Sequence, residues 1–403
     1  MKKVFLFLVL TLLFSQAFAN DANQSTLEGL TTKDDAHLVK KFATKLSTTL
    51  IFETKFSDNY QTTNRQDEYK DSVAKLRLIN KFKLNDVLSI NSRLLVTSID
   101  NRGKVAARNN NPRGGGDRTF ENIGVIAQEL NLVLDHEKYA LIAGKFNLNF
   151  GKAWLWNRGI WIQDLVNNYR QIEKLGFAGV YRLGDAKKTG QYNFSFSAFT
   201  NDRKNLDNSL MVSRDSGHKS DAAPGDTRSL QSYNAALDIN FKFSQQEKLS
   251  YHFAYLNLAV NPRASALAQN KIADQKSVVL NMNYQRPIFE KILLDGLFEY
   301  VETKNLNGNG DLSEKYFTAN FITKFDEHWS FLVGNSNHQY LQYGANGYDQ
   351  NLSEASVGYE FGKTSFFDRL TLQAGYKNLR NDYKTSVDTR NGMGLIMRYY
   401  KDF

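Results

Sequence analysis

Apolar and polar residues alternate along most of the chain from about residue 41 onward. The segment SVAKLRLINKFKL, residues 72–84, is typical, because one set of alternate positions is mainly apolar and the other carries four basic residues. Successive side chains of a β-strand point to opposite faces of the sheet. The pattern therefore predicts strands that have one apolar and one polar face.

Sixteen segments of this kind are expected, and long and short connections alternate between them. A water-soluble sandwich can show such alternation in a few strands, with lysine facing water. Here the alternation recurs in more segments than a sandwich of this kind would show. An even strand number with short turns at one end and long loops at the other is the layout of an outer-membrane barrel. The sequence thus predicts an all-β fold, a transmembrane antiparallel β-barrel of about 16 strands, near residues 41–56, 71–84, 88–99, 120–135, 139–150, 173–183, 191–200, 230–243, 249–260, 275–285, 292–304, 315–325, 329–340, 352–362, 369–380 and 391–403.

The first residues, MKKVFLFLVLTLLFSQAFAN, have the three parts of a secretory signal peptide. Two lysines precede an apolar stretch over 4–14, and Ala17-Phe18-Ala19 follows as a cleavage site. The alternative is a membrane anchor, but the apolar stretch is too short to cross a bilayer comfortably. We expect a signal peptide at 1–19, a short periplasmic segment at 20–40 and the barrel at 41–403.

Composition agrees with an exported barrel. The chain has 28 Phe, 20 Tyr and only 4 Pro, which suits pleated sheets. It has no cysteine, so disulfides, thiol catalysis and a lipid-modified cysteine are excluded. The 51 basic and 42 acidic residues are spread along the chain. Without a basic block, no nucleic-acid partner is expected.

Outward-facing aromatic residues are predicted to form a girdle at each membrane interface. The periplasmic girdle includes Phe42, Tyr251, Trp329, Tyr399 and Phe403. The alternation in 120–135 would turn Gln128 toward lipid, so a β-bulge or an early strand end is expected there. The predicted aromatic residues of the opposite rim are Phe52, Phe56, Phe146, Phe150, Phe298, Tyr300 and Tyr376.

The chain ends in GLIMRYYKDF, an alternating aromatic strand that finishes on Phe403. We predict that it pairs with the first strand and closes the ring, because a barrel leaves no free edge. In this ending and in its strand pattern, the chain resembles the sixteen-stranded diffusion porins of Gram-negative bacteria. The resemblance implies an outer-membrane location among lipid and lipopolysaccharide, recognition of Phe403 by the barrel-assembly machinery, and a homotrimer.

The third long loop, residues 151–174, contains three of the four tryptophans of the chain. In porins of this type the third loop folds into the barrel and forms the constriction. The resemblance implies that the constriction residues here are Lys152, Arg158, Asp164, Arg170 and Glu173. The alternative is that the tryptophans anchor strand ends in the outer membrane interface.

Inward-facing basic residues outnumber acidic ones along the predicted strands. A basic wall is expected on two adjacent strands, formed by Lys75, Arg77, Lys81, Lys83 and Arg93. Like charges along a pore bias its ion selectivity, so one hypothesis is a mild anion preference. The alternative is a solvated lumen whose charges only keep it wet.

The function predicted from these features is passive diffusion of small hydrophilic solutes and ions, with no cofactor. No catalytic residue and no metal ligand is nominated. The segment 305–311 is similar to a calcium loop, but Tyr316 stands where the loop needs a glutamate. Two alternatives stay open: a substrate-specific uptake channel or receptor without a plug, and an adhesin whose loops bind a partner. A barrel enzyme is not expected, because no catalytic constellation near the rim is found.

Overall fold

The computed structural model describes residues 45–63, 68–99, 118–120, 122–156, 159–201, 209, 224–227, 229–260, 272–326, 328–342, 347–362 and 369–403. The predicted signal peptide, the 20–40 segment, Phe42 and Arg158 lie outside the described residues. Within them no helix is both long and apolar enough to cross a membrane.

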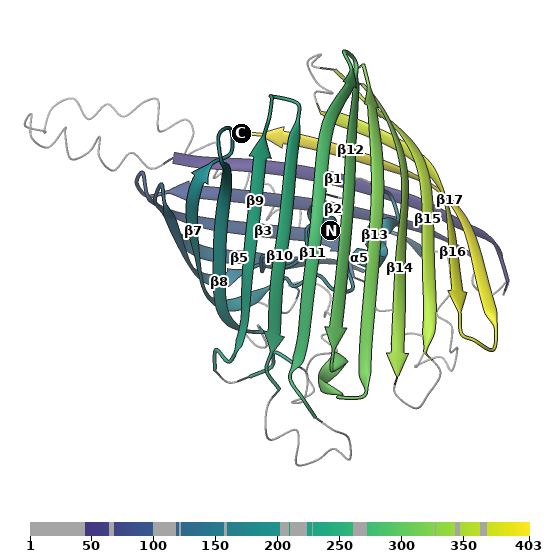
Figure 1. Ribbon diagram of the computed structural model, residues 1–403. Coiled ribbons are helices and arrows are strands. Elements are labelled where there is room, and N and C mark those ends of the chain that lie inside the picture. Colours follow the sequence, from purple (N-terminus) through teal and green to yellow (C-terminus); the bar gives the residue numbers. More distant parts are fainter. Residues whose placement is uncertain are drawn as a thin grey trace, which may run out of the picture.

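Sixteen long antiparallel strands form one closed wall, as the sequence predicts (Figure 1). Each pairs with its neighbours in sequence, and the last pairs with the first. A two-residue strand, β4 (Arg118–Thr119), adds a parallel pairing to β2. The sixteen strands of the wall are β1 (Lys45–Thr62), β2 (Tyr69–Lys83), β3 (Leu88–Ser98), β5 (Ile123–Asp135), β6 (Tyr139–Phe146), β7 (Lys174–Asp185), β8 (Gly190–Asn201), β9 (Ser232–Lys242), β10 (Lys248–Leu258), β11 (Gln275–Phe289), β12 (Ile292–Lys304), β13 (Leu312–Phe325), β14 (Trp329–Gln342), β15 (Tyr348–Glu360), β16 (Leu370–Asp382) and β17 (Val387–Asp402).

The C-terminal strand closes the ring, so its aromatic end is not a free edge. The backbone N–H of Phe403 donates to the carbonyl of Thr48 at 2.9 Å, and the N–H of Thr48 donates back at 3.3 Å. Phe52 is paired directly with Tyr399. The prediction that Phe52 belongs to the opposite rim was therefore wrong, because Tyr399 lies only four residues from the chain end.

The wall is apolar outside and polar inside, the reverse of a water-soluble sheet. On β13, Phe317 is 48% exposed while its neighbour Thr318 is fully buried. On β11, Leu280 is 50% exposed while Asn281 is 4% exposed. Exposed apolar side chains of this kind recur around the whole ring. Such a surface needs lipid rather than water around it.

The predicted bulge at Gln128 is confirmed. Arg93 of β3 pairs with Glu129 of β5, but the next residue, Leu94, pairs with Ala127. Gln128 is therefore an extra residue without a partner, and it is buried. The extra residue shifts the alternation by one position, so polar Gln128 does not have to face lipid.

Of the aromatic residues predicted for the periplasmic girdle, Trp329 and Phe403 are exposed. The Trp329 ring meets that of Tyr359 edge-on, with centroids 4.8 Å apart. Phe146 and Phe150 do not belong to a rim, contrary to prediction, because both lie in an apolar cluster inside the ring. The strand ends at Phe146, and Gly144, with φ of 123°, breaks the regular alternation just before it.

Candidate functional site

The connection between β6 and β7 runs inside the barrel. It carries two short helices, α4 (Ala153–Trp156) and α5 (Ile162–Val166). Its apolar side chains form one buried cluster with the inward side chains of the wall. From the connection these are Leu148, Phe150, Ala153, Ile160, Trp161, Ile162, Leu165, Val166 and Tyr169, and from the wall they are Phe199, Ala236, Ala254, Leu256, Leu258, Val279, Leu297, Val301, Tyr316, Leu352 and Ile396.

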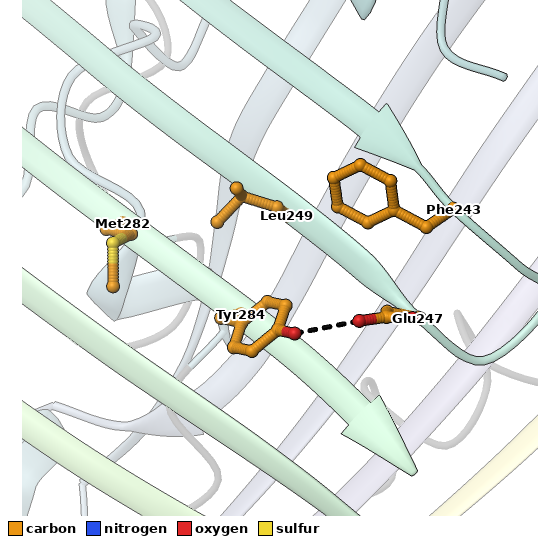
Figure 2. Close-up of a pocket in the computed structure, with 5 residues that line it drawn as sticks. All are labelled: Phe243, Glu247, Leu249, Met282 and Tyr284. Atoms are coloured by element: carbon orange, nitrogen blue, oxygen red, sulfur yellow. Dashed lines mark hydrogen bonds between the residues drawn. The ribbon is translucent and has the colours of Figure 1, made fainter. Parts of the chain in front are cut away.

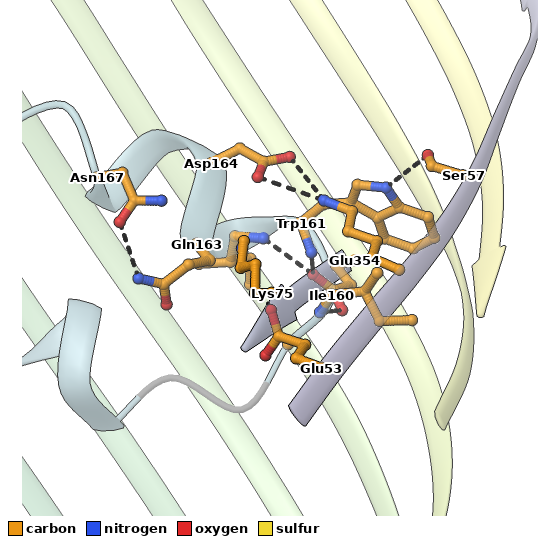
Figure 3. A network of polar contacts seen from close by, with 12 residues as sticks. Glu53, Ser57, Lys75, Ile160, Trp161, Gln163, Asp164, Asn167 and Glu354 are labelled. Atoms are coloured by element: carbon orange, nitrogen blue, oxygen red, sulfur yellow. Dashed lines mark hydrogen bonds and ion pairs between the residues drawn. The ribbon is translucent and has the colours of Figure 1, made fainter. Parts of the chain in front are cut away.

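One wall carboxylate, Glu354 of β15, binds the backbone of this loop (Figure 3). It accepts the N–H groups of Ile160, Trp161 and Ile162 at 2.5, 2.8 and 3.0 Å. The residue is 3% exposed. Hydrogen bonds to a buried carboxylate are stronger than neutral ones, and they satisfy N–H groups that would otherwise be unpaired. Glu354 thus fixes the loop just before α5.

A second wall carboxylate, Glu299 of β12, binds the start of the loop in the same way. It accepts the N–H groups of Lys152 at 2.5 Å and Ala153 at 3.0 Å. The hydroxyl of Tyr169 donates to it at 2.6 Å. Burial and the neighbouring Glu299 raise the pKa of Tyr169 well above its usual value, so this hydroxyl keeps its proton and donates. Glu299 therefore joins both ends of the loop to the wall.

Three glycines of the wall leave room for three consecutive loop side chains. A methyl group on Gly394 of β17 would lie 2.5 Å from the Trp161 ring. One on Gly375 of β16 would lie 3.1 Å from Ile160, and one on Gly334 of β14 would overlap Ile162. All three loop side chains are buried. Glycine at these wall positions lets the loop backbone approach the barrel closely.

Trp161 lies inside the ring and not at the outer interface. Its indole N–H donates to Ser57 of β1 at 3.0 Å, and the ring is buried. Arg398 of β17 donates to the carbonyl of Gly159 at 3.1 Å. These contacts extend the attachment of the loop to the strands where the ring closes.

Two of the predicted constriction residues form ion pairs with residues of the barrel wall. Lys152 contacts Asp238 of β9 at 2.9 Å and is largely buried. Asp164 contacts Lys55 of β1 at 3.2 Å, and its side chain is 56% exposed. The first pair is largely buried, whereas in the second only the carboxylate of Asp164 is exposed and Lys55 is 18% exposed.

The other predicted loop residues differ in surroundings. The guanidinium of Arg170 lies 5.9 Å from the centre of the Trp154 ring, within cation–π range. Glu173 is 7% exposed and pairs with the buried Lys145 at 3.2 Å. Glu173 therefore has little contact with solvent.

The five residues of the predicted basic wall fall into two groups. Lys75 pairs with Glu53 at 3.2 Å, and Arg93 pairs with Glu129 at 3.0 Å. Arg398 also contacts Glu53, at 3.1 Å. In the described part of the chain, no close ion pair is formed by the remaining three, Arg77, Lys81 and Lys83, although Arg77 lies near enough to Glu53 to interact with it electrostatically.

These three cations lie on β2, the neighbour of β1, which contacts the loop through Ser57 and Lys55. They alternate with lipid-facing leucine and phenylalanine, so they point into the ring. Lys81 and Lys83 are nevertheless exposed. Both lie in the last three residues of β2, so their exposure shows open space at the short-turn end of the lumen beside this strand.

Comparisons with solved structures show the same fold. The outer membrane channel DcaP of Acinetobacter baumannii is 11% identical with a TM-score of 0.52, covering 89% of this chain and 97% of its own. A loop L8 deletion mutant of OmpT, an outer membrane protein of Vibrio cholerae, is 12% identical with a TM-score of 0.51, covering 89% and 99%. OccAB4 of Acinetobacter baumannii is 10% identical with a TM-score of 0.50, covering 89% and 98%.

No protein-family model matches the chain, and no curated protein matches it. At the identities above, the likeness shows the fold alone. The fold is the sixteen-stranded barrel of bacterial outer-membrane channels, as the resemblance to porins implies. Together with the lipid-facing exterior, it places the chain in the bacterial outer membrane, as predicted.

Proposed function

We propose that this barrel is a porin, a passive diffusion channel for small hydrophilic solutes and ions. The observation that carries the proposal is the group of exposed, inward-pointing cations on β2. A closed structural barrel has no need of solvated charge inside its wall. No covalent step is involved, so we propose no enzymatic activity.

The loop between β6 and β7 forms the constriction in this proposal. Support comes from its anchoring to two buried wall carboxylates, Glu299 of β12 and Glu354 of β15. Asp164 and Arg170 are the loop residues that meet passing solutes, while Lys152 and Glu173 hold the loop through buried pairs. Arg158, outside the described residues, stays a sequence prediction.

The proposed channel prefers anions mildly. Lys75 and Arg93 are offset by Glu53 and Glu129, so the preference comes from the unpaired cations of β2. Solvent screens charges over about 8 Å at physiological ionic strength, which keeps the effect modest. The preference is therefore expected to grow as salt is lowered.

The test is the single-channel current of the refolded, purified protein in a planar bilayer with a salt gradient. Stable current steps with an anion-selective reversal potential support both parts of the proposal. Steps without anion selectivity support the channel and refute the role of β2. A folded barrel without steps refutes the channel.

A plugless substrate-specific channel is the second candidate. Its support is the pairing of loop tryptophans with cations, because Lys152 lies 5.8 Å from the Trp156 ring in addition to the Arg170 and Trp154 pair. Such pairs can hold a solute that has both a flat apolar face and a charge. A specific channel would show solute-dependent blocks of the current that saturate, whereas a diffusion channel would not.

Assembly is proposed on the resemblance to porins alone. It implies a homotrimer and recognition of Phe403 by the barrel-assembly machinery. Phe403 is 63% exposed and its backbone is paired to Thr48, so its side chain is accessible while the strand is in place. Chemical cross-linking of the membrane-inserted protein would distinguish a trimer from a monomer.

A further inference from the structure

A hollow of ≈ 520 Å³ opens on the wall beside the turn between β9 and β10 (Figure 2). Its lining is mainly apolar, and its polar groups are one carboxylate and one tyrosine hydroxyl. The lining residues are Phe243, Glu247, Leu249, Met282 and Tyr284.

The hollow faces lipid. On β10, His252 is buried and points inward, so the odd-numbered Leu249 and Tyr251 point outward. Leu249 pairs with Tyr284, and Tyr251 pairs with Met282, so both β11 residues share the outer face. The turn is one of the short ones, which in this fold lie on the periplasmic side. The hollow therefore lies at the headgroup level of the periplasmic leaflet.

Two opposite charges stand at its edge. Glu247 accepts the hydroxyl of Tyr284 at 2.8 Å (Figure 2). The side chain of Arg286, two residues further along β11, comes within 3.9 Å of the same carboxylate. The Arg286 side chain is 61% exposed and that of Glu247 is 30% exposed. Both groups thus keep free hydrogen-bonding capacity toward the membrane.

We propose that this hollow binds a glycerophospholipid whose headgroup carries a primary ammonium, of the phosphatidylethanolamine type. Arg286 binds the lipid phosphate, and Glu247 accepts a hydrogen bond from the ammonium. Phe243, Leu249 and Met282 contact the start of an acyl chain. The order of charges on the protein, cation and then carboxylate, complements the phosphate and ammonium of that headgroup.

Other headgroups match less well. A phosphatidylglycerol headgroup offers no cation to Glu247 and brings its own negative charge close to it. A phosphatidylcholine headgroup has a cation, but its methylated nitrogen has no N–H to donate. The proposal is independent of the channel, since it needs only a barrel in a membrane.

The experiment is native mass spectrometry of the purified full chain, mixed with equal amounts of phosphatidylethanolamine, phosphatidylglycerol and phosphatidylcholine. We expect phosphatidylethanolamine adducts to dominate by about tenfold, the change that one charge-assisted hydrogen bond typically makes in binding. In Glu247→Gln, which can still accept the Tyr284 hydroxyl, the preference should disappear.

The matched control is Asp326→Asn. Asp326 pairs with Lys291 at 3.2 Å, and both are turn residues on the same rim, but neither lines the hollow. This variant should keep the wild-type preference. Equal retention of the three lipids, or a preference that survives in Glu247→Gln, would overturn the proposal. So would a result in which Glu247→Gln changes only the oligomeric state, because a second barrel would then be the occupant.

Discussion

The inward side chains on the two sides of the lumen differ in burial and in charge. From β8 to β13 the inward face carries a patch of buried apolar side chains among its polar ones, and Phe199, Leu256 and Val279 of this patch are fully buried in the cluster that the loop between β6 and β7 completes. On β2 the inward face is basic, and Lys81 and Lys83 remain exposed. One side is thus buried, with an apolar cluster beside hydrogen-bonded polar residues such as Asn281 and Thr318, and the other side is solvated.

The difference shows that inward position alone does not decide whether a residue meets solvent. Glu354 and Glu53 both point inward. Glu354 accepts hydrogen bonds from N–H groups of the loop, whereas Glu53 forms ion pairs with Lys75 and Arg398. Charge in the open part of the lumen is what remains after these pairings. Lys81 and Lys83 belong to that remainder, while Arg77 is partly offset by the nearby Glu53.

The largest effect is expected from Glu354→Ala. This change removes three charge-assisted hydrogen bonds and leaves three buried N–H groups unpaired, at a cost of roughly 1–3 kcal/mol each. The loop should leave the wall, so single-channel conductance should rise and become noisier in planar bilayers. Glu360→Gln, on the same strand but exposed, should leave conductance unchanged. An unaltered conductance in Glu354→Ala would contradict the anchoring role.

A large shift in selectivity is expected when the unpaired cations are reversed together, as Arg77→Glu, Lys81→Glu and Lys83→Glu. The reversal potential in a KCl gradient should move toward cation selectivity, more strongly at low salt. Lys75→Gln should shift it much less, because Glu53 already offsets Lys75. Equal shifts per charge from Lys75 and Arg77 would show that pairing does not matter.

A moderate loss of stability is expected from Gly394→Ala. The new methyl group would press on the rigid and buried Trp161 ring, and overpacking of this kind costs about 1–3 kcal/mol. Urea unfolding from lipid vesicles measures the change. Gly296→Ala is the matched control, because its methyl group would make ordinary contacts at 3.4 Å with Phe321. Equal destabilisation of both variants would contradict the view that Gly394 leaves the space occupied by the Trp161 ring.

The smallest effect is expected from Asp164→Asn. The pair with Lys55 is exposed, and exposed pairs contribute only about 0–1 kcal/mol. Thermal stability should therefore change little, while the reversal potential should move slightly toward anions because a luminal negative charge is lost. A marked loss of stability would mean that this pair, and not Glu354, holds the loop.

Much of the fold could be predicted from the sequence. The alternation of apolar and polar residues, together with the lengths of the connections, indicates the number of strands and which side chains point to lipid and which to the lumen. Even the bulge followed from one polar residue, Gln128, at a lipid-facing position. Phe146 and Phe150 were misplaced because an aromatic residue suits a membrane rim and a protein core equally well. Only the path of the loop decides between them.

The contacts of the candidate site could be predicted from the sequence only in part. Inward cations could be named, but their partners depend on register, as in the pair of Arg93 with Glu129 beside the bulge. The anchoring roles of Glu299 and Glu354 join residues more than a hundred positions apart. Two inward glycines on neighbouring strands, Gly375 and Gly394, were the available signal of a close approach.

The central claim is that the lumen is open beside β2 and filled by protein opposite it. Because the chain has no cysteine, single-cysteine variants test this directly in planar bilayers. A charged methanethiosulfonate reagent should react with Arg77→Cys and reduce the channel current, and it should leave Val279→Cys unchanged. Block of the Val279→Cys channel, or an unreactive Arg77→Cys channel that still conducts, would contradict the account.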